Sequence, residues 1–190
     1  MNKAKKKKHI IIAGTSRSGK TTLASMIRKK KSYYNYIPMD SIKRGIFNNF
    51  VKTSGKRWPQ ASPKLVKLMN SITGSNNSNI NKHFYIFDIP TLYPRDVANL
   101  NNKDTIVIFL GYPNITTEKK IELIQKHDPK CSWSYGLSKD KLRKIVVSNI
   151  KFSKVLEKEC KDLNIKFFDT SKNREVILKK ALKYLEAQTL

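Results

Sequence analysis

The sequence predicts an α/β fold in which a parallel β-sheet is covered by helices on both faces. Short apolar runs alternate with segments of helical spacing along the 190 residues, and this alternation is typical of β/α crossover units. The run 105–110 is almost continuously apolar, as is usual for a strand that is buried on both faces. The length suits one domain, and neither a repeat nor a shift in composition divides residues 1–190.

The first predicted strand, 9–13, leads directly into the most specific motif of the chain. The pattern GxxxxGK[ST] is matched by Gly14-Thr15-Ser16-Arg17-Ser18-Gly19-Lys20-Thr21, and a helix is predicted from Thr22 to Lys30. Both glycines allow tight turns that bring backbone amides to phosphate oxygens, and the helix N-terminus adds partial positive charge. Lys20 can reach the β- and γ-phosphates, and the Thr21 hydroxyl can hold Mg²⁺. The sequence therefore predicts a nucleotide-binding loop over residues 14–22.

The next elements follow from apolar runs and turn residues. We expect a turn and a second strand over 33–40, a helix over 41–50, a short helix over 63–72 after a weakly patterned stretch, a surface loop over 73–81, a third strand over 84–88 and one short helix within 90–100. The second strand should end at Asp40 and the third at Asp88.

The second half of the chain continues the alternation. We expect a fourth strand over 105–110, a helix over 118–127 capped by Thr116 or Thr117, an irregular stretch over 128–138, a longer helix that Ser138 caps and that carries Val155 and Leu156, a fifth strand over 165–168, and a last helix that takes Val176, Ile177, Leu178, Ala181 and Leu182 toward the core. In open parallel sheets, ligands bind at the carboxyl ends of the strands. Five residues that follow strands should therefore share one edge: Gly14, Asp40, Asp88, Gly111 and Asp169.

The charge of the chain allows two interpretations. A net charge of +25 is compatible with a nucleic-acid partner. However, the positive residues are mostly lysines spread along the whole chain, whereas a surface shaped for RNA should favour arginine and stacking aromatics. We therefore favour compositional drift, with residues 1–8 as a solvated basic tail.

Other features of composition indicate a cytoplasmic protein. No run approaches the length of a membrane span, and the apolar run after the basic N-terminus leads into the phosphate loop, unlike a secretory signal. Cys131 and Cys160 are far apart in sequence, and neither they nor the three histidines form a metal-binding pattern. We expect both cysteines to be reduced thiols.

The phosphate loop, the acids after the second and third strands, the helical hairpin after the fourth and Asp169-Thr170-Ser171 after the fifth together resemble the P-loop kinases. This group includes nucleoside and nucleotide kinases, shikimate and gluconate kinases, zeta toxins and chloramphenicol phosphotransferase. The resemblance covers nearly the whole chain, although only residues 14–21 form a highly specific motif. It implies a three-layer fold with a five-stranded sheet in the order 2-3-1-4-5, ATP and Mg²⁺ as cofactors, and a mobile lid at 128–138.

The resemblance also implies roles for individual residues. Asp40 matches the acid that binds a hydroxyl acceptor and takes its proton, and Asp88 matches the acid that holds Mg²⁺ through water. Thr170 and Ser171 would border the adenine, and Arg143 would contact the phosphates in transfer. From the residues alone, Asp40 could instead cap a helix, and Thr170 and Ser171 could simply end a strand.

The acceptor is less well defined than the nucleotide. Arg44 and Arg95 are candidate substrate contacts, and Arg17 points either to the acceptor or to water. The lid has no dense set of arginines of the kind that a nucleotide acceptor needs. Ile89, in place of a glutamate, follows Asp88, which disfavours activation of water. The sequence therefore predicts a phosphotransferase acting on a small hydroxylated or nucleotide-like acceptor; the alternatives are a polynucleotide 5′-kinase and a nucleotide-gated nucleic-acid-binding protein.

Overall fold

The computed structural model describes residues 7–42, 58–74, 83–90, 92–100, 104–128, 132 and 134–189. Five parallel strands form one sheet in the order β2-β3-β1-β4-β5. The strands are β1 (His9–Gly14), β2 (Tyr34–Pro38), β3 (Phe84–Pro90), β4 (Thr105–Gly111) and β5 (Lys166–Asp169). The predicted fold class and strand order are therefore confirmed.

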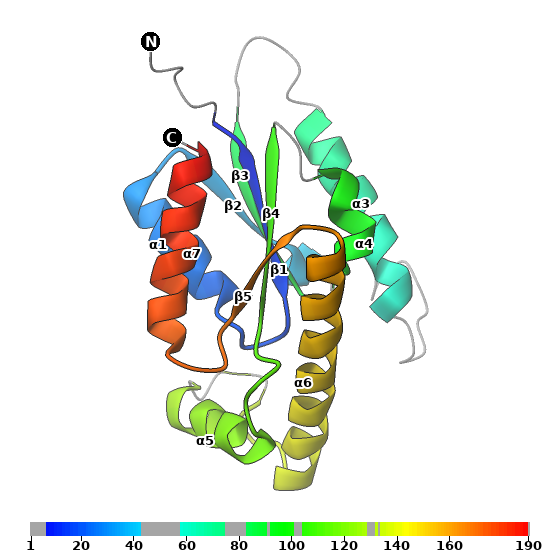
Figure 1. The fold of residues 1–190 in the computed structure, drawn as a ribbon, viewed down its shortest axis with the longest axis vertical. Helices are drawn as coiled ribbons and strands as arrows, with labels where there is room; N and C mark the ends of the chain where they lie inside the picture. The colour runs from blue at the N-terminus through cyan, green and yellow to red at the C-terminus, as the bar shows by residue number, and fades with distance from the viewer. Residues whose placement is uncertain are drawn as a thin grey trace.

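Helices cover both faces of the sheet, as the apolar strands require (Figure 1). On one face lie α1 (Lys20–Lys30) and α7 (Arg174–Thr189); on the other lie α3 (Trp58–Gly74), α4 (Pro94–Val97) with the short 3₁₀ turn η2 (Ala98–Leu100), and α6 (Lys139–Asp162). Successive side chains of β1 enter opposite layers, because side chains alternate along a strand. Ile10 and Ile12 pack in the core beneath α1 and α7, whereas Ile11 and Ala13 pack in the second core.

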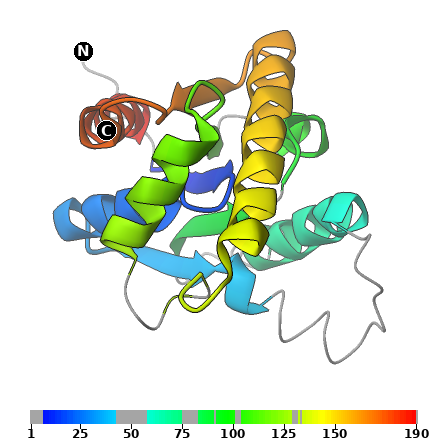
Figure 2. The same cartoon turned by 90° about the horizontal axis from the view of Figure 1, so that it is seen from below.

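A helical hairpin extends beyond the carboxyl edge of the sheet. It consists of α5 (Thr117–His127) and the first half of α6, which lie below the strands in Figure 1 and across the phosphate loop in Figure 2. Both predicted caps are confirmed: the Thr116 side chain accepts a hydrogen bond from the Lys119 amide, and the Ser138 side chain accepts one from the Lys141 amide. Within the described residues, none of the helices is both long enough and apolar enough to cross a membrane.

Three expectations need correction. Helix α3 begins at Trp58 rather than at 63, because a proline in the first turn lacks only an amide that has no helical partner there, so Pro59 does not prevent the helix. Val176 does not face the core; its exposed fraction is 50%. Strand β2 ends at Pro38, so Asp40 lies in a helical turn over 39–42.

Several expectations concern positions outside the described residues. These are most of the tail 1–8, the remainder of the 41–50 helix, most of the 73–81 loop, and part of the 128–138 lid, including Cys131. Cys160 is a free, buried thiol, and burial raises its pKa to about 12.

The end of β1 can be occupied only by glycine. Gly14 has a φ of +136°, and a Cβ at this position would lie 1.9 Å from the Leu110 carbonyl oxygen of β4. Gly19, at the start of α1, has a φ of +105°. Left-handed φ values are unfavourable for residues with a side chain. Both motif glycines are therefore required by the path of the loop.

We expect Gly14→Ala to lower the free energy of unfolding by at least about 2 kcal/mol, because the added methyl group meets a carbonyl that cannot move without disturbing β4. Urea denaturation measures this change. Gly74→Ala is the matched control, because a Cβ there has no heavy atom within 4 Å. Equal stability of the two variants would contradict the described path of the loop.

Candidate functional site

The phosphate loop, residues 14–21, opens onto a cleft of about 310 Å³ at the carboxyl edge of the sheet. The cleft is lined by the loop, the first turn of α1, the ends of β2 and β3, and the start of α7. The lining residues are Ser16, Arg17, Gly19, Lys20, Thr21, Thr22, Tyr36, Pro38, Asp40, Asp88, Pro90 and Arg174. Of the five residues predicted to share this edge, Asp40 and Asp88 line the cleft, together with Lys20 of the motif, whereas Gly14, Gly111 and Asp169 are not among its lining residues. Gly14, Thr15 and Ser18 are buried.

Lys20 is the first residue of α1, and its ammonium group folds back over the loop. Its Nζ donates to the Thr15 carbonyl oxygen at 2.8 Å, and the side chain is almost fully buried. Burial lowers the pKa of Lys20, and Arg17 lowers it further, while the charges of Asp88 and Asp40 oppose this change. A buried ammonium at the mouth of the loop is a favourable partner for an anion, which would relieve the cost of its burial.

Asp88, near the end of β3, is bound by two hydroxyl groups. Thr21 Oγ1 donates to Asp88 Oδ2 at 2.6 Å, and the Tyr36 hydroxyl donates to the same oxygen at 2.9 Å. Burial and the Asp88 charge raise the pKa of Tyr36 to about 12, so this hydroxyl remains a donor at neutral pH. A carboxylate and a hydroxyl side by side at a phosphate loop fit Mg²⁺, which takes few protein oxygens together with substrate phosphates.

Asp40 is exposed on the rim of the cleft, two residues beyond β2. Its neighbour Met39 is fully buried in the core beside α3, which fixes the turn that carries Asp40. Asp40 and Lys20 line the same cleft, and the charge of Asp40 raises the pKa of Lys20, against the effect of burial. An exposed carboxylate in this place can accept a proton from a bound hydroxyl group.

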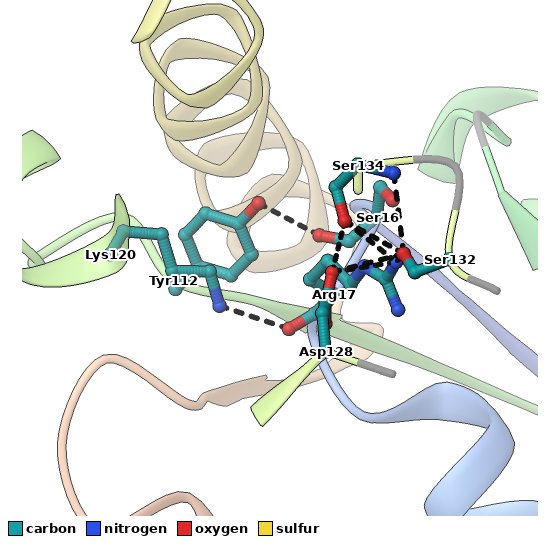
Figure 3. A network of polar contacts seen from close by, with 7 residues as sticks. All are labelled: Ser16, Arg17, Tyr112, Lys120, Asp128, Ser132 and Ser134. Carbon is teal, nitrogen blue, oxygen red and sulfur yellow. Dashed lines mark hydrogen bonds and ion pairs between the residues drawn. The ribbon is translucent and has the colours of Figure 1, made fainter. Parts of the chain in front are cut away.

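The Arg17 guanidinium contacts the segment after α5 (Figure 3). Its guanidinium forms an ion pair with Asp128 at 2.8 Å and hydrogen bonds with the hydroxyls of Ser132 and Ser134. Both serine hydroxyls also donate to the Asp128 carboxylate. The phosphate loop is therefore linked to the part of the predicted lid that the structure describes.

Two further residues, Tyr112 and Lys120, donate hydrogen bonds to carbonyl oxygens of the loop. The Tyr112 hydroxyl donates to the Ser16 carbonyl oxygen at 2.7 Å, and Lys120 Nζ donates to the Arg17 carbonyl oxygen at 2.9 Å (Figure 3). Sequence reasoning missed both residues. Tyr112 directly follows β4, at the ligand edge, which was an available signal; Lys120 is one of many lysines and had none.

Two of the predicted phosphate and substrate arginines, Arg143 and Arg95, pair with acids elsewhere on the described surface. Arg143 forms an exposed ion pair with Glu118 at 2.8 Å, and Arg95 pairs with Glu159 and stacks over the Tyr93 ring. Neither of them is among the described residues that line the cleft. Arg44 lies outside the described residues.

The segment after β5 supplies a cation that the sequence did not single out. Arg174 begins α7, lines the cleft and donates to Thr22 Oγ1 at 2.9 Å. Its place next to the ligand edge, at the start of a helix after a strand, was a signal that could have found it. Thr170 is buried and bonds to the Gly111 carbonyl oxygen through its amide (2.7 Å) and its hydroxyl (2.9 Å). The Ser171 hydroxyl accepts a hydrogen bond from the Asn114 amide.

No protein-family model matches the sequence, and no curated protein sequence matches it. Solved structures do match. A gluconokinase from Sinorhizobium meliloti 1021 gives a TM-score of 0.57 at 14% identity, over 98% of this chain and 95% of the other. A shikimate kinase from Bacteroides thetaiotaomicron gives a TM-score of 0.55 at 16% identity, over 94% of this chain and 98% of the other. A deoxyadenosine kinase from M. mycoides with bound dATP gives a TM-score of 0.51 at 19% identity, over 94% of this chain and 99% of the other.

These similarities extend over nearly the whole chain and concern its fold. The five-stranded sheet in the order 2-3-1-4-5, with helices on both faces, is that of the P-loop small-molecule kinases. The resemblance stated from the sequence is thereby confirmed at the level of architecture.

Removing one of the two hydroxyl donors to Asp88 tests the described site. We expect Tyr36→Phe to lower the free energy of unfolding by about 1–2 kcal/mol, because a buried carboxylate loses a hydrogen bond. Tyr135→Phe, at an exposed tyrosine, should change it by less than about 0.5 kcal/mol. Urea denaturation compares the two, and equal stability would contradict the contact between Tyr36 and Asp88.

Proposed function

We propose that the protein is an ATP-dependent phosphotransferase that moves the γ-phosphoryl group to a small hydroxylated or nucleotide-like acceptor. One observation carries this proposal. Lys20, the Thr21–Asp88 pair and Asp40 line one cleft, so that groups suited to the donor phosphates and to an acceptor hydroxyl share it. The P-loop kinase fold supports the same class of reaction, and a cytoplasmic location would give access to ATP.

The loop over residues 14–22 would hold the donor phosphates through its backbone amides and through Lys20; the Thr15 amide is the exception, because it bonds to the Leu110 carbonyl oxygen. The amides at the start of α1 have no partner within the helix and are available to an anion. Lys20 would exchange its bond to the Thr15 carbonyl for the β- and γ-phosphates. Arg174, beside Thr22, is placed to add a second positive charge close to the same phosphates. Thr170 and Ser171 remain the proposed border of the adenine.

Thr21 and Asp88 would hold Mg²⁺, since their oxygens lie side by side in the cleft. The ion, when bound, neutralises charge on the β- and γ-phosphates. Tyr36 orients Asp88 for this role by its own hydrogen bond to Oδ2. The remaining groups need only position the donor and the acceptor, because phosphoryl transfer depends mainly on alignment and charge stabilisation.

Asp40 would take the proton of the acceptor hydroxyl as the acceptor oxygen attacks the γ-phosphorus, the bond from the γ-phosphorus to the bridging oxygen breaks and ADP leaves. The carboxylate is exposed at the rim and acts on Lys20 by its charge. An alcohol acceptor needs mainly such a base, whereas a phosphorylated acceptor would also need arginines. Among the described residues, the only arginines that line the cleft are Arg17 and Arg174. This favours a hydroxylated acceptor without a phosphate of its own.

Arg143 stays a predicted contact of the transferred phosphate. It is paired with Glu118, and the side chains are 57% and 66% exposed. An ion pair this exposed contributes little to stability, because solvent screens the two charges. Arg143 could therefore exchange Glu118 for a phosphate at small cost when the predicted lid closes.

We expect Lys20→Ala to abolish the rise in unfolding temperature that MgATP causes in the wild-type protein, because the variant lacks the cation at the β- and γ-phosphates. Thermal unfolding with and without MgATP measures the effect. Lys29→Ala is the control, because Lys29 lies on the same helix and is exposed. A full MgATP shift in the Lys20 variant would contradict the assigned phosphate contact.

We expect Asp40→Asn to bind MgATP as the wild type does but to lose about 10²- to 10⁴-fold in turnover, because an amide cannot accept the hydroxyl proton. ATP consumption with a panel of nucleosides, sugars and alcohols first identifies an acceptor, on which the variant is then assayed. Asp162→Asn, at the exposed end of α6, should keep full turnover. Wild-type turnover by Asp40→Asn would remove Asp40 from the mechanism.

A further inference from the structure

Lys120 is a buried cation on α5 that the proposed reaction does not use. Only 6% of the residue is exposed, although lysine is rarely buried without a partner. Its Nζ donates to the Arg17 carbonyl oxygen at 2.9 Å and lies 3.8 Å from the centre of the Tyr112 ring. A hydrogen bond and a cation–π contact thus compensate for part of the desolvation of the ammonium group. Figure 3 shows Lys120, Tyr112 and the loop together.

The carbonyl that Lys120 binds belongs to a strained corner of the phosphate loop. Arg17 has a φ of 62°, in the left-handed region. This conformation is unfavourable for a residue with a Cβ and persists only where the surroundings enforce it. The hydrogen bond from Lys120 fixes the Arg17 carbonyl, which belongs to the peptide group that follows this residue. It therefore helps to hold Arg17 in its left-handed conformation.

Tyr112 and Ser153 hold the two preceding residues of the loop. The Tyr112 hydroxyl donates to the Ser16 carbonyl at 2.7 Å. The Ser153 hydroxyl, on α6, accepts a hydrogen bond from the Tyr112 amide at 3.1 Å and lies 3.2 Å from Thr15 Oγ1. Successive residues of the loop are thus held by Tyr112, Ser153 and Lys120 through the Thr15 hydroxyl and the carbonyl groups of Ser16 and Arg17.

We propose that Lys120 is a positioning residue that holds the phosphate loop in its anion-binding shape through the Arg17 carbonyl, and that its positive charge strengthens binding of the triphosphate. The inference rests on the proposed function, because it requires that the loop binds a nucleotide. Lys120 itself does not line the cleft, so it acts through the loop and through its charge.

The charges around Lys120 make this role dependent on pH. Burial lowers the pKa of Lys120 to about 8; Arg174 of α7 and Arg17 and Lys20 of the loop add to this effect, and Asp128, after α5, opposes it. The phenol of Tyr112 stays neutral, because burial raises its pKa. A bound triphosphate favours protonated Lys120, so binding above pH 8 should take up a proton. The affinity should therefore fall as the pH rises through 8.

The test compares Lys120→Met, Lys120→Arg and the exposed control Lys126→Met by calorimetric titration with MgATP at pH 7.5 and 9.0. Wild-type affinity should fall by up to about eightfold between these values, if Lys120 has a pKa near 8 in the free protein. At pH 7.5, the affinity of Lys120→Met for MgATP should be at least about tenfold lower than that of the wild type. Lys120→Arg should keep most of the affinity and lose the pH dependence, because arginine stays charged. Lys126→Met should match the wild type at both values.

Each outcome separates the inference from the proposed function. If the wild type binds no MgATP, the proposed function fails and the inference fails with it. If the wild type binds and Lys120→Met binds equally well, only the inference is overturned. A pH dependence that persists in Lys120→Arg would assign the proton to another group, such as Lys20, and would also overturn it. Circular dichroism checks folding; if Lys120→Met is unfolded, Lys120→Arg alone decides by the same criteria.

Discussion

The close approach of β1 to β4 at Gly14 is the constraint on which the rest of the site depends. The Thr15 amide donates to the Leu110 carbonyl at 3.1 Å, and the glycine leaves no side chain between the two strands. The chain can therefore turn sharply at the edge of the sheet and return as α1. Without this contact, Lys20 and the first amides of α1 would not face the cleft.

The register of the parallel strands places the acids around this loop. Ile12 of β1 is paired with Asp88 of β3, and Pro38 of β2 is paired with the same residue. Asp88 therefore lies beside the loop, and the turn after Pro38 brings Asp40 to the same cleft. The hairpin of α5 and α6 then supports the loop from the opposite side through Lys120. Each group comes from a rigid element, which suits a site that works by alignment.

The sequence predicted the parts of this arrangement that local patterns determine. The strand and helix that flank the phosphate loop, the alternation of strands and helices and the caps at Thr116 and Ser138 depend on neighbouring residues, and the structure confirms them. The roles of Lys120 and Arg174 depend on how helices cross the edge of the sheet, which no local pattern encodes. The exposed ion pair of Arg143 with Glu118 likewise depends on the packing of α5 against α6.

The central claim is that the loop over residues 14–22 holds the phosphates of a nucleotide through backbone amides. Amide chemical shifts of the ¹⁵N-labelled protein during titration with MgATP test it most directly. We expect the largest changes at Gly14 to Thr22, because these N–H groups would gain charged acceptors. Unchanged shifts throughout this segment at saturating MgATP, or changes confined to distant residues, would contradict the account.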